Sequence, residues 1–142
     1  MSVEPAIARG PADYETFRIA AGDTNRMSLI ADPVRDNVPF TAIVEIFDAG
    51  GKTPPNSHQH AYELFYVLSG SGFAYCEGKK FPVKAGDSFV VRPGHEHIVE
   101  NPGTEKLYCL TVMMPNEEFA ELIRSGIREP LDAADMKVIA GV

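Results

Sequence analysis

The four histidines of this chain fall into two pairs, and these pairs are the residues whose spacing most directly indicates chemistry. His58 and His60 are one residue apart and are followed by Glu63, and His95 and His97 form the second pair. In a β-strand, residues i and i+2 point to the same face, so one pair can direct two imidazoles at one metal ion. Glu63 joins them if the chain bends just before it. Imidazole and carboxylate ligands suit transition metals better than calcium or magnesium.

The two histidines of the second pair are expected to have different roles. His97 begins an apolar run and is predicted to point inward with Val99, whereas His95 lies in a turn and is predicted at the rim. A simpler alternative stays open, because an isolated His-x-His pair can be a solvated surface feature. Glu63 can likewise contact solvent or support the ligands without binding the metal.

Short apolar runs separated by Gly and Pro surround both pairs. Many short strands at regular spacing predict an all-β sandwich or barrel. The expected strands are Phe17–Ile19, Met27–Ala31, Phe40–Phe47, Glu63–Leu68, Phe73–Glu77, Phe81–Val83, Ser88–Val91, His97–Val99 and Leu107–Met113.

The two ends of the chain differ from this pattern. Residues 1–16 are predicted to form a loose arm. Residues 116–142 are predicted to form two short helices that pack on the barrel, with Asn116 and Asp132 as N-caps.

Composition excludes several classes of protein. The chain has 142 residues and a net charge of −7, which fits one domain with no basic stripe for nucleic acid. No apolar run is long enough to cross a membrane. The N-terminus lacks the pattern of a signal peptide, so a cytoplasmic location is expected.

Both histidine pairs lie in segments that resemble the two motifs of the cupin superfamily. The first motif spans residues 51–70 and the second spans 86–101. The matching residues are Gly51, His58, His60, Glu63 and Gly70, then Gly86, Pro93, Gly94, His97 and Asn101. Three details differ from the family pattern: the gap between His60 and Glu63 is short, the gap before His58 is one residue longer, and Arg92 stands where a proline is usual.

The resemblance implies a double-stranded β-helix, or jelly-roll barrel, over residues 17–115. It also implies that His58, His60, Glu63 and His97 hold one divalent transition metal, which is Fe, Mn, Ni, Cu, Co or Zn. Seven further residues are candidates for the pocket wall: Phe65, Val67, Tyr75, Phe89, Val91, Arg92 and Val99. Arg92 either meets a substrate carboxylate or is solvated, and Tyr75 either binds a ligand or packs. The four apolar residues of β-like runs either line the pocket or form only core: Phe65, Val67, Phe89 and Val91.

Three functions remain open at this point. The first is a metal-dependent oxygenase acting on a small phenolic, enolisable or thiol substrate. The second is a Lewis-acid isomerase, lyase or decarboxylase, in which Glu63 could move a proton. The third is a non-catalytic module that binds a small ligand. A homodimer is also expected, because Leu64, Tyr66 and Leu68 form an apolar face that points away from the pocket.

Overall fold

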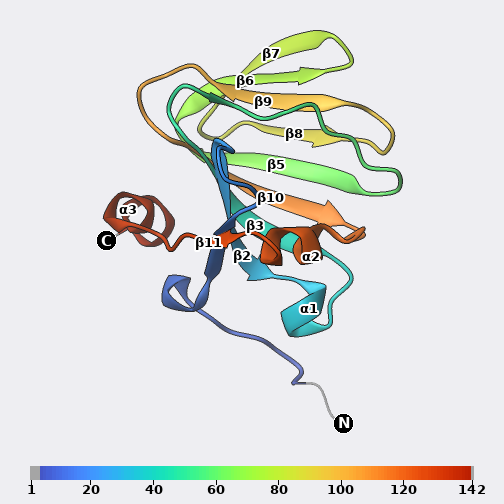
Figure 1. The fold of residues 1–142 in the computed structure, drawn as a ribbon, viewed down its shortest axis with the longest axis vertical. Coiled ribbons are helices and arrows are strands. Elements are labelled where there is room, and N and C mark those ends of the chain that lie inside the picture. Colours follow the sequence, from blue (N-terminus) through green and yellow to red (C-terminus); the bar gives the residue numbers. More distant parts are fainter. Residues whose placement is uncertain (1–3, 142) are drawn as a thin grey trace.

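Two antiparallel β-sheets face each other and enclose the interior of the protein (Figure 1). The structure is a computed structural model, and it describes residues 4–141. The larger sheet has the strand order β11-β1-β2-β3-β10-β5-β8, and the smaller has the order β4-β9-β6-β7. The strand pattern predicted an all-β sandwich or barrel, and the structure has the jelly-roll arrangement that the resemblance to cupins implied.

Each strand is short and most are joined by tight turns. The larger sheet contains β1 (Glu15–Arg18), β2 (Asn25–Ala31), β3 (Thr41–Phe47), β5 (Tyr62–Ser69), β8 (Ser88–Val91), β10 (Leu107–Met114) and β11 (Ile127–Arg128). The smaller sheet contains β4 (Gly51–Lys52), β6 (Ser71–Cys76), β7 (Lys79–Lys84) and β9 (His97–Asn101). The helical elements are η1 (Pro11–Asp13), α1 (Pro33–Asp36), α2 (Phe119–Arg124) and α3 (Ala133–Ala140).

Alternation along β5 separates the interior of the protein from its outer surface. Glu63, Phe65 and Val67 are 3%, 2% and 0% exposed, whereas Tyr66 between them is 43% exposed. Residues directly opposite each other in paired strands share one face, and Phe65 lies opposite Thr111 of β10. The register therefore places Glu63 on the same inner face as the apolar core.

The two C-terminal helices cover different parts of the larger sheet. Phe119 and Ile123 of α2 join the interior cluster that contains Met113. Val138 and Ile139 of α3 instead pack on the outer face of β3 and β10. The side chain of Asp132 accepts the N–H of Asp135, which confirms Asp132 as the N-cap of α3. Neither helix covers the outer face of β5, which stays exposed.

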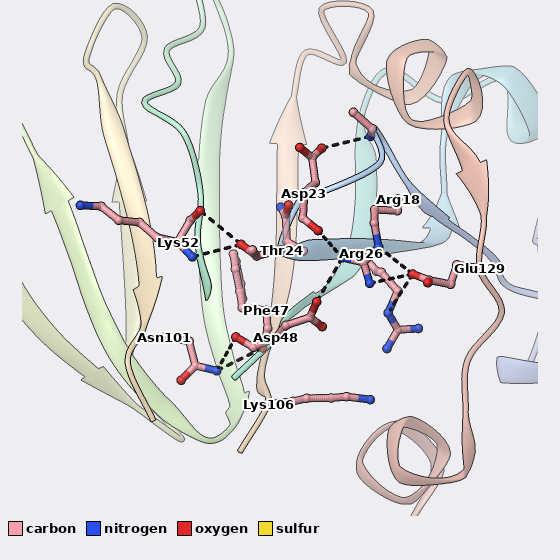
Figure 2. A network of polar contacts seen from close by, with 12 residues as sticks. Arg18, Asp23, Thr24, Arg26, Phe47, Asp48, Lys52, Asn101, Lys106 and Glu129 are labelled. Carbon is pink, nitrogen blue, oxygen red and sulfur yellow. Dashed lines mark hydrogen bonds and ion pairs between the residues drawn. The ribbon is translucent and has the colours of Figure 1, made fainter. Parts of the chain in front are cut away.

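A network of polar contacts joins several loops and strands (Figure 2). The Asn101 side chain is 1% exposed, and its amide nitrogen lies 3.1 Å and 3.2 Å from the carbonyl oxygens of Phe47 and Asp48. The guanidinium of Arg18 contacts the Asp48 carboxylate at 3.1 Å and that of Glu129 at 2.7 Å. These contacts link β9, β3 and β1 to the C-terminal segment.

Part of the predicted N-terminal arm contacts the rest of the structure. Residues 1–3 of the predicted arm lie outside the described residues. Arg9 forms an ion pair with Asp36, and β1 begins at Glu15, two residues before the predicted strand. Over residues 4–141, the longest helix has 8 residues and none is long and apolar enough to span a membrane.

Candidate metal centre

Three side chains from a loop and two different strands converge inside the barrel. His58 lies in the loop before β5, Glu63 lies in β5, and His97 is the first residue of β9. One nitrogen from each imidazole and one carboxylate oxygen all lie within 4.8 Å of one another. His58 Nε2 is 3.2 Å from Glu63 Oε1, and His97 Nε2 is 3.0 Å from the same oxygen.

A short backbone bridge brings the two histidines together. Asn56 and His97 exchange two backbone hydrogen bonds, of 3.0 Å and 2.8 Å. This bridge places the loop that carries His58 beside the start of β9, and the two imidazole centroids are 5.9 Å apart. The Phe119 ring lies 6.2 Å from the His58 ring and borders it from α2.

His60 and His95 do not take part in this cluster. Both side chains are exposed, and His95 lies 3.3 Å from the Glu77 carboxylate at the surface. The expectation for His60 assumed a regular strand, but residues 57–61 form no strand. Because the alternation rule does not hold in a loop, His58 can point inward while His60 does not.

Glu117 fixes the backbone of this loop from the other side. Its carboxylate accepts the N–H groups of Gln59, His60 and Ala61 at 2.9, 2.5 and 3.1 Å. Although desolvation opposes it, these hydrogen bonds lower the pKa of Glu117 below its usual value. His58 Nδ1 lies 3.9 Å from Glu117, so Glu117 constrains both the loop and the ring that faces Glu63.

The electrostatics of the cluster suit a cation. Burial alone would raise the pKa of Glu63, but the imidazoles of His58 and His97 hold it below its usual value. Burial would lower the pKa of His97, and the Glu63 carboxylate instead raises it. Each group therefore favours a positive charge next to the carboxylate.

The hydrogen bonding supports the same conclusion. Within residues 4–141, Glu63 Oε1 and His97 Nδ1 are buried and have no hydrogen-bond partner of acceptable geometry. Buried polar atoms are normally satisfied, so such atoms call for an explanation. The donor set of two imidazoles and one carboxylate fits a divalent transition metal. A metal bound by His58, Glu63 and His97 would satisfy the Glu63 oxygen that the protein leaves free.

A cavity of about 490 Å³ opens onto the cluster. Of the seven predicted wall residues, Phe65 and Val99 line it. Val67, Phe89 and Val91 belong to an apolar core cluster instead. The remaining two face elsewhere: Tyr75 donates to Glu100 at 2.8 Å, and Arg92 is exposed.

Sequence reasoning missed a second buried carboxylate in the wall of this cavity. Glu45 of β3 is 6% exposed and lines the cavity with the metal-ligand candidates. It accepts hydrogen bonds from Asn25 Nδ2 at 2.8 Å and from the Thr111 hydroxyl at 3.3 Å. Burial and the nearby Glu63 charge raise the pKa of Glu45 to about 7. The available signal was one acidic residue inside the otherwise apolar run Phe40–Phe47.

This fold, with a cluster of two histidines and one glutamate inside it, is typical of a β-barrel of the cupin type, and comparison with known families agrees. The family model described as "Cupin domain" matches residues 43–113. The chain therefore belongs to the cupin family. The matched region contains His58, Glu63 and His97, together with Glu45.

Among curated proteins, the chain is similar to an oxalate-binding protein of Thermotoga maritima, with 36% identity over 69 residues, which are 44% of this chain and 57% of that protein. It is also similar to the L-ectoine synthase of Halomonas elongata, with 29% identity over 116 residues and 80% of each chain. The chain spans less than two thirds of the first of these relatives.

Solved structures share the fold. A predicted oxalate decarboxylase from Thermotoga maritima superposes with a TM-score of 0.67 at 22% identity, over 77% of this chain and 99% of the other. An RmlC-like cupin from Shewanella frigidimarina also gives a TM-score of 0.67, at 20% identity over 84% and 99% of the two chains. These similarities establish the fold alone.

Proposed function

We propose that this protein is a metal-dependent enzyme of the oxygenase type that acts on a small phenolic, enolisable or thiol substrate. The observation that carries the proposal is the convergence of His58, Glu63 and His97 at the end of a cavity. Two histidines and one carboxylate with open positions are the ligand set of non-haem Fe(II) oxygenases. Among the candidate metals, this donor set makes Fe(II) the first to test.

In this proposal His58, Glu63 and His97 hold the metal and leave one side open to the cavity. The bound metal would supply a binding position for the substrate oxygen or sulfur and redox chemistry with O₂. Phe65 and Phe119 border the cluster with apolar surface and would limit water near the reacting atoms. Glu117 would keep the His58 loop in place during turnover.

His60 has no role as a ligand in this proposal. Its side chain is exposed, and its backbone N–H is bound to Glu117. The resemblance to the cupin motifs implied four ligands, and the geometry favours three of them. A three-ligand site leaves more coordination positions open for substrate and oxygen than a four-ligand site does.

The test is oxygen uptake by protein loaded anaerobically with Fe(II). Phenols, diketones and thiols form the substrate panel, and products are identified by mass spectrometry. Substrate-dependent oxygen uptake that His58→Ala abolishes and His60→Ala retains would support the proposal. Metal-loaded protein that consumes no oxygen with any member of the panel would count against it.

A Lewis-acid function is the second candidate, and the similarity to L-ectoine synthase favours it. That relative is matched over 80% of both chains, and its name describes a synthase rather than an oxygenase. A metal held by the same three residues would then polarise a carbonyl or hydroxyl group. Turnover that persists without oxygen distinguishes this function from the first. Tight ligand binding without turnover would instead indicate a binding module.

A further inference from the structure

The cavity of the candidate metal centre is lined by an unusual set of charges. Besides Glu63, four carboxylate residues line it, and the lining contains neither lysine nor arginine. These residues are Asp23, Glu45, Glu117 and Glu118. A dication bound to Glu63 leaves one net positive charge, which four carboxylates outnumber. A ligand with several negative charges would therefore enter a repulsive field.

Glu45 differs from every other buried carboxylate among residues 4–141. Asp36 is paired with Arg9, Asp32 with Arg124, and Asp135 with Arg26. Glu63 faces two imidazoles. For Glu45, the partners within hydrogen-bond distance are the neutral groups of Asn25 and Thr111.

An isolated buried carboxylate is unfavourable unless a cation accompanies it. The protein places this group in the wall of an open cavity rather than inside the apolar core. Asn25 donates a hydrogen bond to one carboxylate oxygen of Glu45, and Thr111 donates one to the other. Each oxygen can accept a further hydrogen bond. The missing cationic partner can therefore come from a ligand in the cavity.

We propose that the natural ligand of this cavity is a small molecule with an ammonium group, which pairs with the carboxylate of Glu45 while another part of the molecule faces the metal. This assignment rests on the proposed function in taking the same cavity as the ligand site. It does not depend on which metal is bound or on whether oxygen is used. It disfavours dicarboxylates as ligands, whatever the relatives bind.

Three probes of similar length test the charge preference on zinc-loaded protein, in which no redox turnover occurs. They are 4-aminobutyrate, 4-hydroxybutyrate and succinate, which share one carboxylate and differ at the other end. Calorimetry or NMR titration at neutral pH should show the ammonium compound binding about tenfold or more tighter than the hydroxyl compound, with succinate weakest. Succinate binding as tightly as 4-aminobutyrate would overturn the proposal.

Two variants identify the residue responsible. Glu45→Gln should remove the advantage of 4-aminobutyrate over 4-hydroxybutyrate, and Glu118→Gln, which alters an exposed carboxylate of the same cavity, should keep most of it. An unchanged preference in Glu45→Gln would overturn the assignment. If Glu45→Gln does not fold, ¹³C NMR of the wild-type carboxylate replaces it, because the ammonium compound must lower the pKa of Glu45.

A metal-free control separates this proposal from the metal proposal. Butylamine and 1-butanol need no metal, so they are titrated into metal-free wild type and metal-free Glu45→Gln. Preferential binding of butylamine that depends on Glu45 would support the ammonium site even if no metal is ever found. If neither 4-aminobutyrate nor butylamine binds the wild type, the ammonium proposal is wrong even when metal is present.

Discussion

Replacing Glu45 by glutamine should change how the stability of the metal-free protein depends on pH. The folded protein holds the pKa of Glu45 at about 7, against a usual value of 4.5. Between these two values the folded state keeps the proton and the unfolded state loses it. Stability that Glu45 contributes therefore falls as the pH rises through this window. Glutamine is neutral throughout and lacks this dependence.

The size of the effect follows from the separation of the pKa values. The pH interval from about 5.5 to the folded pKa of about 7 spans roughly 1.5 pH units. Over this interval the free energy of unfolding changes by about 1.4 kcal/mol per pH unit. Raising the pH from about 5.5 to about 8 should thus stabilise Glu45→Gln relative to wild type by about 2 kcal/mol. Glutamine can still accept from Asn25 and contact Thr111, so the neutral hydrogen bonds are largely retained.

Urea unfolding of chelator-treated protein at the two pH values measures this difference. Metal must be absent, because a cation at Glu63 would alter the charge that Glu45 experiences. Glu118→Gln is the matched control, and its difference from wild type should not change with pH, since Glu118 is exposed. A difference between Glu45→Gln and wild type that stays constant across both pH values would refute the claim that Glu45 is an uncompensated buried acid.

Four further predictions concern the loop that carries His58, the helix α3, the exposed face of β5 and the release of metal at low pH. Glu117→Ala should weaken metal binding about 10- to 100-fold in a competition titration, as expected for a residue that supports a metal ligand. Glu117→Gln should restore part of the affinity. Equal metal affinity in wild type and both variants would contradict this prediction. Asp135→Asn should destabilise the protein by about 3 kcal/mol in urea unfolding at neutral pH, because it removes the buried counter-charge of Arg26 and leaves only the more distant and less buried Glu129 at 3.7 Å. A loss below about 1 kcal/mol would contradict this. Burial would raise the pKa of Asp135, but its hydrogen bonds outweigh burial and lower the pKa. The stability that the ionised Asp135 contributes in wild type should therefore be lost as the pH falls below ~3.9. The protein should be a homodimer by light scattering at micromolar concentration, and Tyr66→Glu on the exposed face of β5 should give a monomer; a monomeric wild type excludes this. Bound metal should be released in acid, because protons compete with the metal for the imidazole nitrogens. Full retention at about pH 4, well below the ordinary histidine pKa of ~6.5, argues against a histidine site.

The strands could be predicted closely from the sequence because alternation and turn residues act locally. The predicted strand Ser88–Val91 has the bounds of β8, and Glu63–Leu68 lies within β5. The inward direction of Glu63 followed from the same alternation, since its neighbours Phe65 and Val67 are buried.

The directions of the side chains around the candidate metal centre could not all be predicted, because they depend on loop conformation and on the distance between the two sheets. His60 lies in a segment without strand geometry, so its direction depends on the contact with Glu117 from a distant part of the chain. Val67 and Val91 were correctly expected to be buried, but they pack in the apolar core rather than along the cavity. Only the register of β2, β3 and β10 brings Glu45 to the cavity with Asn25.

Metal content of four histidine variants tests the central claim most directly, because each pair contains one histidine of the cluster and one exposed histidine outside it. Elemental mass spectrometry on tag-free protein should find about one transition metal per chain in wild type, His60→Ala and His95→Ala. The same measurement should find it lost in His58→Ala and His97→Ala. Loss of metal in His60→Ala as complete as in His58→Ala, or no metal in wild type even after reconstitution, would contradict a centre built from His58, Glu63 and His97.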